Sequence, residues 1–321
     1  MSGLAGGLLV VLGLAVLAFV AGAAWALAGW FGAWRLNRHA PRFEDSMFSP
    51  FEMSVDAEDA EFTTRDGVTL RGWLLHRPEI RRTIVVMHGY RGNKTHLLGI
   101  SSNLWRMGFN VLLFDFRGRG ASDPAPFTMG LWEVEDLAAA LDWLSGRVAN
   151  ASVGLLGFSM GAVVALLGGA DPRVRAIVAD SAFGSQRAVL ENAAERDAVR
   201  WLRGRIEGRR FLPVMEWWHR RWGKPPFDAI APEQAVDRLA GTPLLFIHGT
   251  EDRWIPVAQA ERLFAAAPQP KEAWHVRGAA HCGAYFADRI VYSTRVAAFF
   301  DRHLARRPSP TPADLVARGE H

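Results

Sequence analysis

Six short apolar runs alternate with helical patterns along the chain, and this alternation constrains the fold more than any other feature. The runs are bounded by turn residues, as in TIVVM at Thr83–Met87, which is followed by His88 and Gly89. Such runs are typical of strands buried on both faces of a sheet. The other five cover residues 111–116, 152–156, 176–179, 244–247 and 273–276. Strands that alternate with helices predict an α/β fold with a mostly parallel central sheet and helices on both of its faces.

A hairpin is predicted ahead of this series. Segments 61–65 and 70–76 flank Asp66 and Gly67, a pair that favours tight turns between strands. Helical patterns cover residues 95–107, 131–144, 160–169, 258–267 and 288–304. We expect one domain over residues 60–306, with an antiparallel edge supplied by the hairpin. Residues 307–321 are rich in proline and polar side chains, and we expect a flexible tail there.

The composition excludes several classes of protein. Of the 321 residues, 50% are hydrophobic and 11% aromatic, unlike a disordered or collagen-like chain. Cys282 is the only cysteine, which excludes an internal disulfide framework and a multi-cysteine metal site. The formal net charge of +4 is modest for a chain of this length.

The N-terminal residues predict a membrane anchor over residues 1–34, followed by a linker over residues 35–59. No side chain is charged in the 31 residues from Leu4 to Trp34, whereas about 20 apolar residues suffice to cross a bilayer. A helix of that length must tilt or place one end in the interface. Tryptophans near its end resemble an interfacial belt, and arginines follow: Trp25, Trp30, Trp34, Arg35, Arg38 and Arg42.

Two other interpretations of this apolar run stay open, a cleaved signal peptide and a buried core helix. A signal peptide needs a positive segment ahead of a short apolar core, and no Lys or Arg precedes this run. Because the positive flank follows the run, the positive-inside rule predicts a single-pass protein with its large domain on the cytoplasmic side. Large domains can translocate regardless of charge, so the opposite orientation stays open.

A charged insertion interrupts the alternation of strands and helices. About 60 residues separate the runs at 176–179 and 244–247, where a short connection is expected. Residues 187–230 hold ten basic and six acidic side chains and four of the thirteen tryptophans. We interpret residues from about 184 to 232 as a helical cap over the sheet. Either the cap faces a membrane, where Arg and Trp are both favoured, or its tryptophans pack on the core and its arginines are solvated.

The string GFSMG at residues 157–161 predicts a nucleophilic serine, Ser159. It lies between the strand pattern SVGLL and the helical pattern GAVVALL, which is the position of a nucleophile elbow. Small residues two before and two after the serine let strand and helix pack closely. The serine oxygen then stands clear of the sheet edge. The alternative is an ordinary turn whose serine caps the helix.

A serine hydroxyl is a weak nucleophile without a base, and the base and its acid are expected later in the chain, in the order Ser, Asp, His. Asp252 lies on the loop after the strand pattern PLLFI, and His281 lies on the loop after the last predicted strand. The active sites of α/β sheets gather at these carboxyl ends. Asp180 and Glu251 remain alternative acids.

An oxyanion hole requires two backbone N–H groups. One should belong to Met160, the residue after the nucleophile. The other should come from the loop HGYRGN at residues 88–93, where we expect Tyr90. A glycine-rich turn without a catalytic part is the alternative. His88 and His248 end predicted strands, and we interpret both as structural.

From about residue 60 to 305, the chain resembles the α/β-hydrolases. The strings MHGYRGN, FDFRGRGAS, GFSMG, HGTEDRWIP and GAAH match landmarks of that superfamily in order. With its N-terminal anchor, the chain is similar to membrane-bound serine hydrolases related to monoglyceride lipases and protein depalmitoylases. The resemblance implies a Ser159–His281–Asp252 triad, no metal and no cofactor. It also implies a cap that shapes the acyl or leaving-group pocket.

The expected function is hydrolysis of carboxylic esters through an acyl-enzyme, by a serine hydrolase anchored in a membrane. The expected partners are an acyl ester or lipid-like substrate and the membrane itself, contacted by the N-terminal helix and, on one interpretation, by the cap. A thioesterase or depalmitoylase with the same triad stays open, and so does a serine peptidase or amidase. The alternative without enzyme activity is a catalytically silent membrane adaptor. Ser159 excludes a dehalogenase, which needs an aspartate at the elbow. The cap mixes charges of both signs and holds no nucleic-acid motif, so no nucleic-acid partner is expected.

Overall fold

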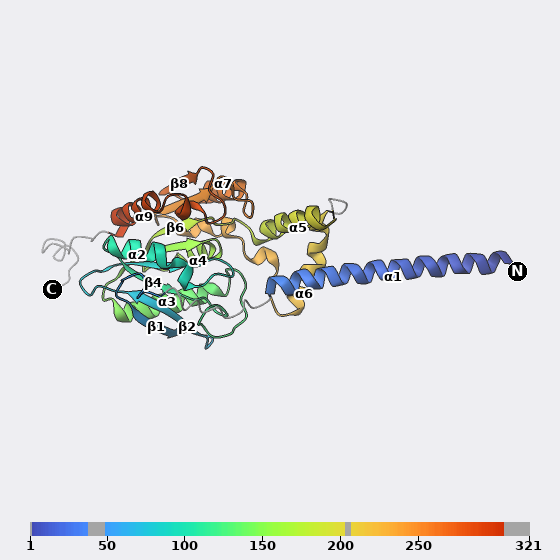
Figure 1. Cartoon of the computed structure of the whole chain (residues 1–321), viewed down its shortest axis with the longest axis horizontal. Coiled ribbons are helices and arrows are strands. Elements are labelled where there is room, and N and C mark those ends of the chain that lie inside the picture. Colours follow the sequence, from blue (N-terminus) through green and yellow to red (C-terminus); the bar gives the residue numbers. More distant parts are fainter. Residues whose placement is uncertain (1, 38–48, 203–206, 305–321) are drawn as a thin grey trace, which may run out of the picture. The chain divides into compact units, whose positions relative to one another are not determined.

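The computed structural model describes residues 2–37, 49–202 and 207–304, and it forms two compact units. The larger unit contains His39–Ser185 and Ile230–His321, and it is built around one eight-stranded sheet (Figure 1). The smaller unit contains Met1–Arg38 and Gln186–Ala229. The predicted tail at 307–321 and part of the predicted linker, residues 38–48, lie outside the described residues.

The strands of the larger unit follow the predicted series. The hairpin strands β1 (Glu58–Thr63) and β2 (Thr69–Leu75) pair antiparallel, and β2 pairs antiparallel with β4 (Asn110–Phe114). From β4 onward, each strand pairs parallel with the next one across the sheet. These strands are, in order, β3 (Arg82–Met87), β5 (Ser152–Phe158), β6 (Val174–Asp180), β7 (Leu244–Gly249) and β8 (Lys271–Val276). The order across the sheet is β1-β2-β4-β3-β5-β6-β7-β8. The predicted α/β fold with an antiparallel edge is therefore confirmed.

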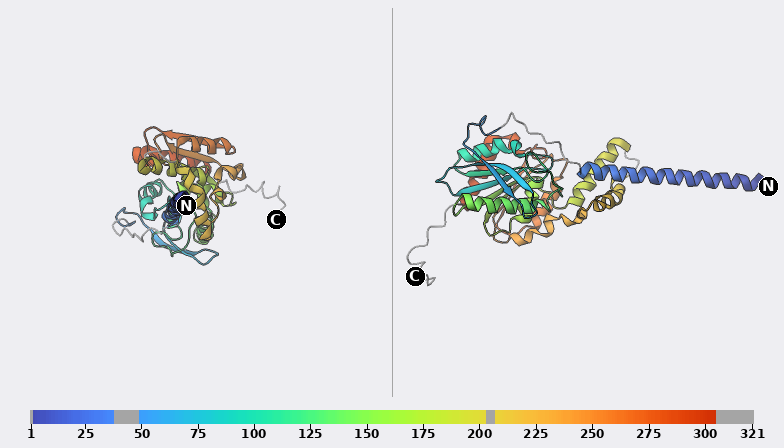
Figure 2. Two further views of the ribbon diagram at one scale, coloured as in Figure 1. Left: turned by 90° about the vertical axis from the view of Figure 1, so that its right-hand side faces the viewer. Right: turned by 90° about the horizontal axis from the view of Figure 1, so that it is seen from below.

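Helices cover both faces of the sheet (Figure 2). On one face, α2 (Leu98–Arg106) packs beside α9 (Arg289–Leu304), and their apolar side chains form a cluster with alternate strand residues such as Ile84 and Val86. On the other face, α3 (Glu133–Arg147) packs beside α4 (Met160–Gly168). The remaining helices of this unit are η1 (Lys94–Leu97), η4 (Pro232–Gln234), η5 (Val236–Leu239), α7 (Val257–Ala266) and α8 (Ala284–Ala287).

The smaller unit joins the N-terminal helix to the insertion. Helix α1 runs from Ser2 to Asn37, three residues past the predicted anchor. The insertion folds as α5 (Gln186–Leu202), η2 (Gly208–Phe211), α6 (Leu212–Arg221) and η3 (Phe227–Ala229). Helix α6 lies beside the second half of α1 (Figure 1). The helical character of the insertion agrees with the sequence pattern, whereas its packing on α1 is a feature that the sequence did not predict.

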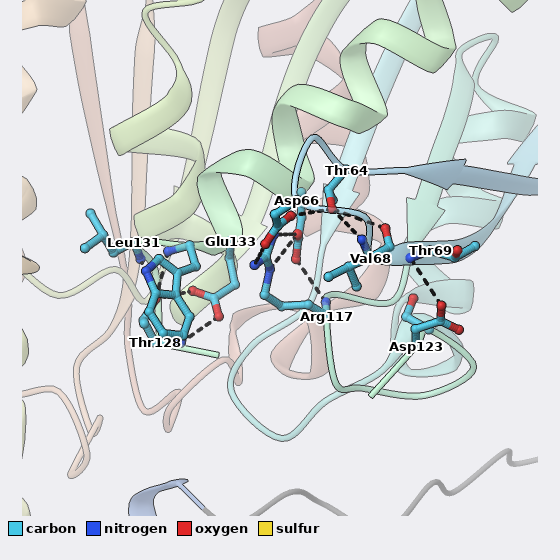
Figure 3. A network of polar contacts seen from close by, with 12 residues as sticks. Thr64, Asp66, Val68, Thr69, Arg117, Asp123, Thr128, Leu131 and Glu133 are labelled. Carbon is cyan, nitrogen blue, oxygen red and sulfur yellow. Dashed lines mark hydrogen bonds and ion pairs between the residues drawn. The ribbon is translucent and has the colours of Figure 1, made fainter. Parts of the chain in front are cut away.

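A buried polar network fixes the loop that follows β4 (Figure 3). Arg117 is buried and donates from Nε to Asp136 on α3 at 2.8 Å, while its outer nitrogens reach Asp66 in the hairpin turn. Burial raises the pKa of Asp136 to about 6, although the Arg117 guanidinium acts in the opposite direction. Nearby, Glu133 accepts both the N–H and the O–H of Thr128. The network ties the hairpin, the loop after β4 and α3 together.

We expect Arg117→Ala to destabilise the larger unit by about 3–5 kcal/mol, because it leaves the buried carboxylate of Asp136 without its partner. Arg71→Ala is the matched control, since it removes pairs with Glu61 and Asp123 that are each at least a third exposed. Exposed pairs contribute about 1 kcal/mol or less. Urea unfolding of the detergent-solubilised variants measures the difference, and equal losses of stability would contradict the structural role of Arg117.

Candidate active site

Ser159 occupies a strained turn between β5 and α4. Its backbone has a φ of +52°, a conformation that residues other than glycine rarely adopt. Two glycines permit the close approach of strand and helix, since a Cβ on Gly157 would lie 2.2 Å from the Gly161 oxygen and one on Gly161 would lie 2.3 Å from the Met87 oxygen. The turn has the geometry of a nucleophile elbow. The alternative of a helix-capping serine does not hold, because the Ser159 side chain makes no capping hydrogen bond.

The structure brings Ser159, His281 and Asp252 into one hydrogen-bonded row. His281 Nε2 lies 3.0 Å from Ser159 Oγ, and His281 Nδ1 lies 2.7 Å from Asp252 Oδ2. An ionised carboxylate only accepts hydrogen bonds, so the imidazole donates from Nδ1 to Asp252. Nε2 is then free to accept the serine proton. This arrangement can activate the hydroxyl of Ser159 as a nucleophile.

Asp252 is fixed by contacts to both of its carboxylate oxygens. Oδ1 accepts the backbone N–H groups of Trp254 at 2.9 Å and Ile255 at 2.8 Å, which leaves Oδ2 for His281. His248 lies behind the carboxylate, with Nε2 2.9 Å from the Ile255 oxygen and 3.5 Å from Asp252 Oδ2. Burial lowers the pKa of His248. These contacts agree with the structural role predicted for His248.

The two alternative acids, Asp180 and Glu251, are held by other surroundings. The carboxylate of Asp180, at the end of β6, accepts hydrogen bonds from the hydroxyls of Ser181 at 2.8 Å and Tyr292 at 2.7 Å. Burial raises the pKa of Asp180 to about 6, against the opposing effect of these hydrogen bonds. The side chain of Glu251 is exposed. Of the three candidates, Asp252 is the one whose contact with His281 the structure describes.

Ser181 connects Asp180 to the histidine loop, and sequence reasoning missed it. Its Oγ donates to Asp180 and accepts the backbone N–H of Cys282 at 3.0 Å, directly after His281. Ser181 and Cys282 both have positive φ angles, +55° and +52°. Asp180 and Ser181 form a polar pair directly after a strand pattern. Such a position indicates that both lie at the carboxyl edge of the sheet, where the candidate active site is. It does not reveal which backbone group the serine binds.

The loop after β3 packs directly against the elbow. A Cβ on Gly89 would lie 3.3 Å from both the Phe158 oxygen and Ser159 Cβ. Met160 is the first residue of α4, so its N–H has no partner within the helix. The two segments that carry the predicted oxyanion residues, Tyr90 and Met160, therefore meet at Ser159.

His88 holds this loop in place. Its Nδ1 lies 2.8 Å from the Gly89 oxygen, and its Nε2 accepts the backbone N–H of Phe116 at 3.1 Å. Burial lowers the pKa of His88 to about 4, so the imidazole is neutral at pH 7 and can make one bond as donor and the other as acceptor. These contacts agree with the structural role predicted for His88.

Over the part of the chain that the structure describes, no group of three or more His, Cys, Asp or Glu side chains is arranged to hold a metal ion.

A mostly parallel sheet with a serine elbow between its fifth strand and the next helix defines a hydrolase of the α/β type. The alpha/beta hydrolase family matches this chain over residues 84–293. The chain belongs to that family, as the sequence motifs predict.

Relatives and solved structures agree with this assignment. The uncharacterized protein YfhR of Escherichia coli O157:H7 is 28% identical over 256 residues, which cover 77% of this chain and 80% of YfhR. The uncharacterized protein Rv2307c of Mycobacterium tuberculosis is 30% identical over 254 residues, covering 77% and 81%. Among solved structures, the Pyrococcus furiosus esterase Pf2001 is similar with a TM-score of 0.70 and 26% identity, over 84% of this chain and 99% of the esterase.

Proposed function

We propose that the protein is a membrane-anchored serine hydrolase that cleaves carboxylic esters of acyl or lipid-like substrates. The observation that carries the proposal is the hydrogen-bonded row in which His281 lies between Ser159 and Asp252. The likeness to the Pyrococcus furiosus esterase supports an ester as the bond that is cleaved. Similarity to monoglyceride lipases and protein depalmitoylases remains part of this proposal.

The proposed reaction is acyl transfer to water. Ser159 Oγ attacks the ester carbonyl carbon while His281 Nε2 takes the serine proton, and the C–O bond to the leaving alcohol breaks as His281 returns that proton to it. Water then attacks the acyl-enzyme with His281 again as base, which releases the acid and restores Ser159. Asp252 holds the imidazole and stabilises its charged form. The N–H groups of Met160 and Tyr90 stabilise the negative oxygen of both tetrahedral intermediates.

A fluorophosphonate probe tests the catalytic part of this proposal. Only an activated serine reacts quickly, so the full chain in detergent should be labelled at Ser159, and labelling should disappear in Ser159→Ala. Activity on esters, thioesters and amides with matched acyl chains of graded length then ranks the bond types. A thioester or amide preferred over the matched ester would replace the proposed chemistry. Failure of Ser159 to react would favour the catalytically silent adaptor.

The membrane part of the proposal rests on α1. Residues Val11–Asn37 are long and apolar enough to cross a membrane, a property that signal sequences share. Described side chains from Val11 to Ala24 are all exposed, which is what lipid contact requires and what argues against a buried core helix. Arg35 lies in the last turn of the helix, and the positive-inside rule then favours a cytoplasmic hydrolase domain.

We expect the full chain to stay in the membrane pellet after washing with high salt or with alkaline carbonate. Both washes release proteins held by surface charge, whereas a spanning helix of about 20 apolar residues stays inserted. Quantitative blotting of pellet and supernatant measures the distribution. Release by either wash would contradict a spanning helix, and a mature N-terminus near residue 24 would identify a signal peptide instead.

A further inference from the structure

The second half of α1 is a packed part of the cap. A Cβ on Gly29 would lie 2.5 Å from Val214 Cγ1, and one on Gly32 would lie 3.1 Å from Met215 Sδ. A Cβ on Gly22, two turns earlier on α1, would have no described atom within 4 Å. A Cβ on Gly29 would therefore collide with α6, while one on Gly32 would press on the flexible side chain of Met215. The contact begins beyond Gly22.

Helices α1 and α6 run in the same direction. The Trp25 ring stacks on the Phe211 ring, with centroids 4.3 Å apart, at the start of α6. Asn37 Nδ2 lies 2.9 Å from His219 Nδ1, near the end of α6. At 1.5 Å per residue, Trp25 and Asn37 are about 18 Å apart along the axis. The start of α6 is thus level with Trp25, and its end is level with the end of α1.

The part of α1 before Trp25 has the length of a membrane span, so the proposed anchoring places the bilayer surface near Trp25. From Leu4 to Ala24 the chain has 21 residues without charge, and the described side chains from Val11 to Ala24 are exposed. Such a segment spans about 32 Å as a helix, close to the hydrocarbon thickness of about 30 Å. The aromatic pair of Trp25 and Phe211 then lies at the interface, where tryptophan is favoured. The rest of the apolar run, from Trp25 onward, packs against the insertion.

Two arginines and one acidic side chain lie in residues 207–211, where the cap reaches this level. We call residues 207–211 the cap tip. In it, Arg209 and Arg210 are 64% and 65% exposed and share the partner Glu207, which is 47% exposed. The Glu195 carboxylate accepts the N–H groups of Gly208 and Arg209 and so fixes the backbone of the tip.

We propose that the cap tip binds the anionic headgroups of the bilayer that α1 spans, through Arg209 and Arg210. This inference rests on the proposed membrane anchoring of α1. Basic side chains near an anionic surface are attracted within a Debye length of about 8–10 Å. Arg210 directly precedes Phe211, whose ring stacks on Trp25, and Arg209 lies one residue earlier. Arg220 and Arg221, at the far end of α6, are level with Asn37 and lie beyond the Debye length.

The test uses the full chain in vesicles of phosphatidylcholine alone or mixed with phosphatidylglycerol. A fluorophore on Pro213→Cys, an exposed position beside the cap tip, reports contact with lipids that carry a nitroxide on the headgroup. A fluorophore on Trp222→Cys reports from the far end of α6, and the unsubstituted chain, whose only cysteine is Cys282, gives the blank. We expect quenching at position 213 that strengthens with phosphatidylglycerol and weakens with salt, and little quenching at position 222.

Two charge-matched double variants separate headgroup binding from net charge. Quenching at position 213 reports the ratio of chains whose cap tip contacts the bilayer to chains whose tip does not. Arg209→Gln with Arg210→Gln should lower this ratio by about fivefold for each arginine removed. Arg220→Gln with Arg221→Gln removes the same charge and should change the ratio by less than about twofold, because these side chains lie beyond the screening length. Equal effects of the two pairs, or equal quenching in the two lipid mixtures, would overturn the proposal.

A steric variant tests whether α1 holds the tip in place. Gly29→Leu should push α6 away and reduce quenching at position 213, whereas Gly22→Leu should leave it unchanged because that position is open. Unchanged quenching in Gly29→Leu would refute the positioning by α1. Carbonate washing and fluorophosphonate labelling of the same vesicles report anchoring and serine reactivity separately. Failure at the tip is therefore distinguishable from failure of the proposed function.

Discussion

Ser159→Ala is expected to lower kcat for ester hydrolysis by about 10³–10⁶-fold while leaving the fold intact. The variant removes the oxygen that His281 Nε2 approaches at 3.0 Å. The Cβ stays, so the strained backbone at this turn meets no new contact. Initial rates on a chromogenic ester, with thermal unfolding in detergent as the check on folding, measure the effect.

Ser145→Ala is the matched control for this variant. Ser145 is exposed on α3 and donates to the Leu141 oxygen, away from His281. The same deletion of a hydroxyl there should leave kcat within about twofold, as surface substitutions usually do. Retention of more than a tenth of the wild-type rate in Ser159→Ala would refute the nucleophile assignment.

Asp252→Asn is expected to lower kcat by about 10⁴-fold, the loss found when the acid of a serine triad becomes an amide. Two backbone N–H groups point at Oδ1 of Asp252, so the amide oxygen must take that place. The amide NH₂ group then faces His281 Nδ1 and favours the tautomer with its proton on Nε2. That tautomer cannot accept the proton of Ser159. Rates on the same ester measure the loss.

Asp180→Asn is the comparison for the acid. Its neighbours are the hydroxyls of Ser181 and Tyr292, which can donate to or accept from an amide. We therefore expect a loss of kcat far smaller than the loss for Asp252→Asn. A larger loss for Asp180→Asn would transfer the acid role from the loop after β7 to the end of β6.

The sheet and its elbow could be predicted because local patterns specify both. Strands buried on two faces must be apolar throughout, so runs such as Thr83–Met87 stand out in the sequence. Motif spacing also predicted that Ser159, Asp252 and His281 would lie close together, since the carboxyl ends of parallel strands meet at one edge, and the structure places them so. Local sequence therefore determined the parts of the site that lie directly after strands.

Contacts between distant segments could not be predicted in the same way. The bond from Cys282 N–H to Ser181 Oγ joins residues 101 positions apart, and neither residue type indicates the other. The packing of α6 on α1 could not be predicted for the same reason. In the sequence, Gly29 looks like any glycine of an apolar helix, and only the structure shows that it lies against Val214. The length of the apolar run was visible in the sequence, but the packing of its second half on α6 was not.

The split origin of the smaller unit has a consequence for synthesis on the ribosome. Helix α1 emerges first, whereas α6 begins 175 residues after α1 ends. At about 5–20 residues per second, roughly 9–35 s pass before the partner of Gly29 exists. During that interval the second half of α1 is apolar and has no protein surface to pack against. Under the proposed anchoring, the membrane covers α1 until α6 packs on it, which makes this packing a late, long-range step of folding.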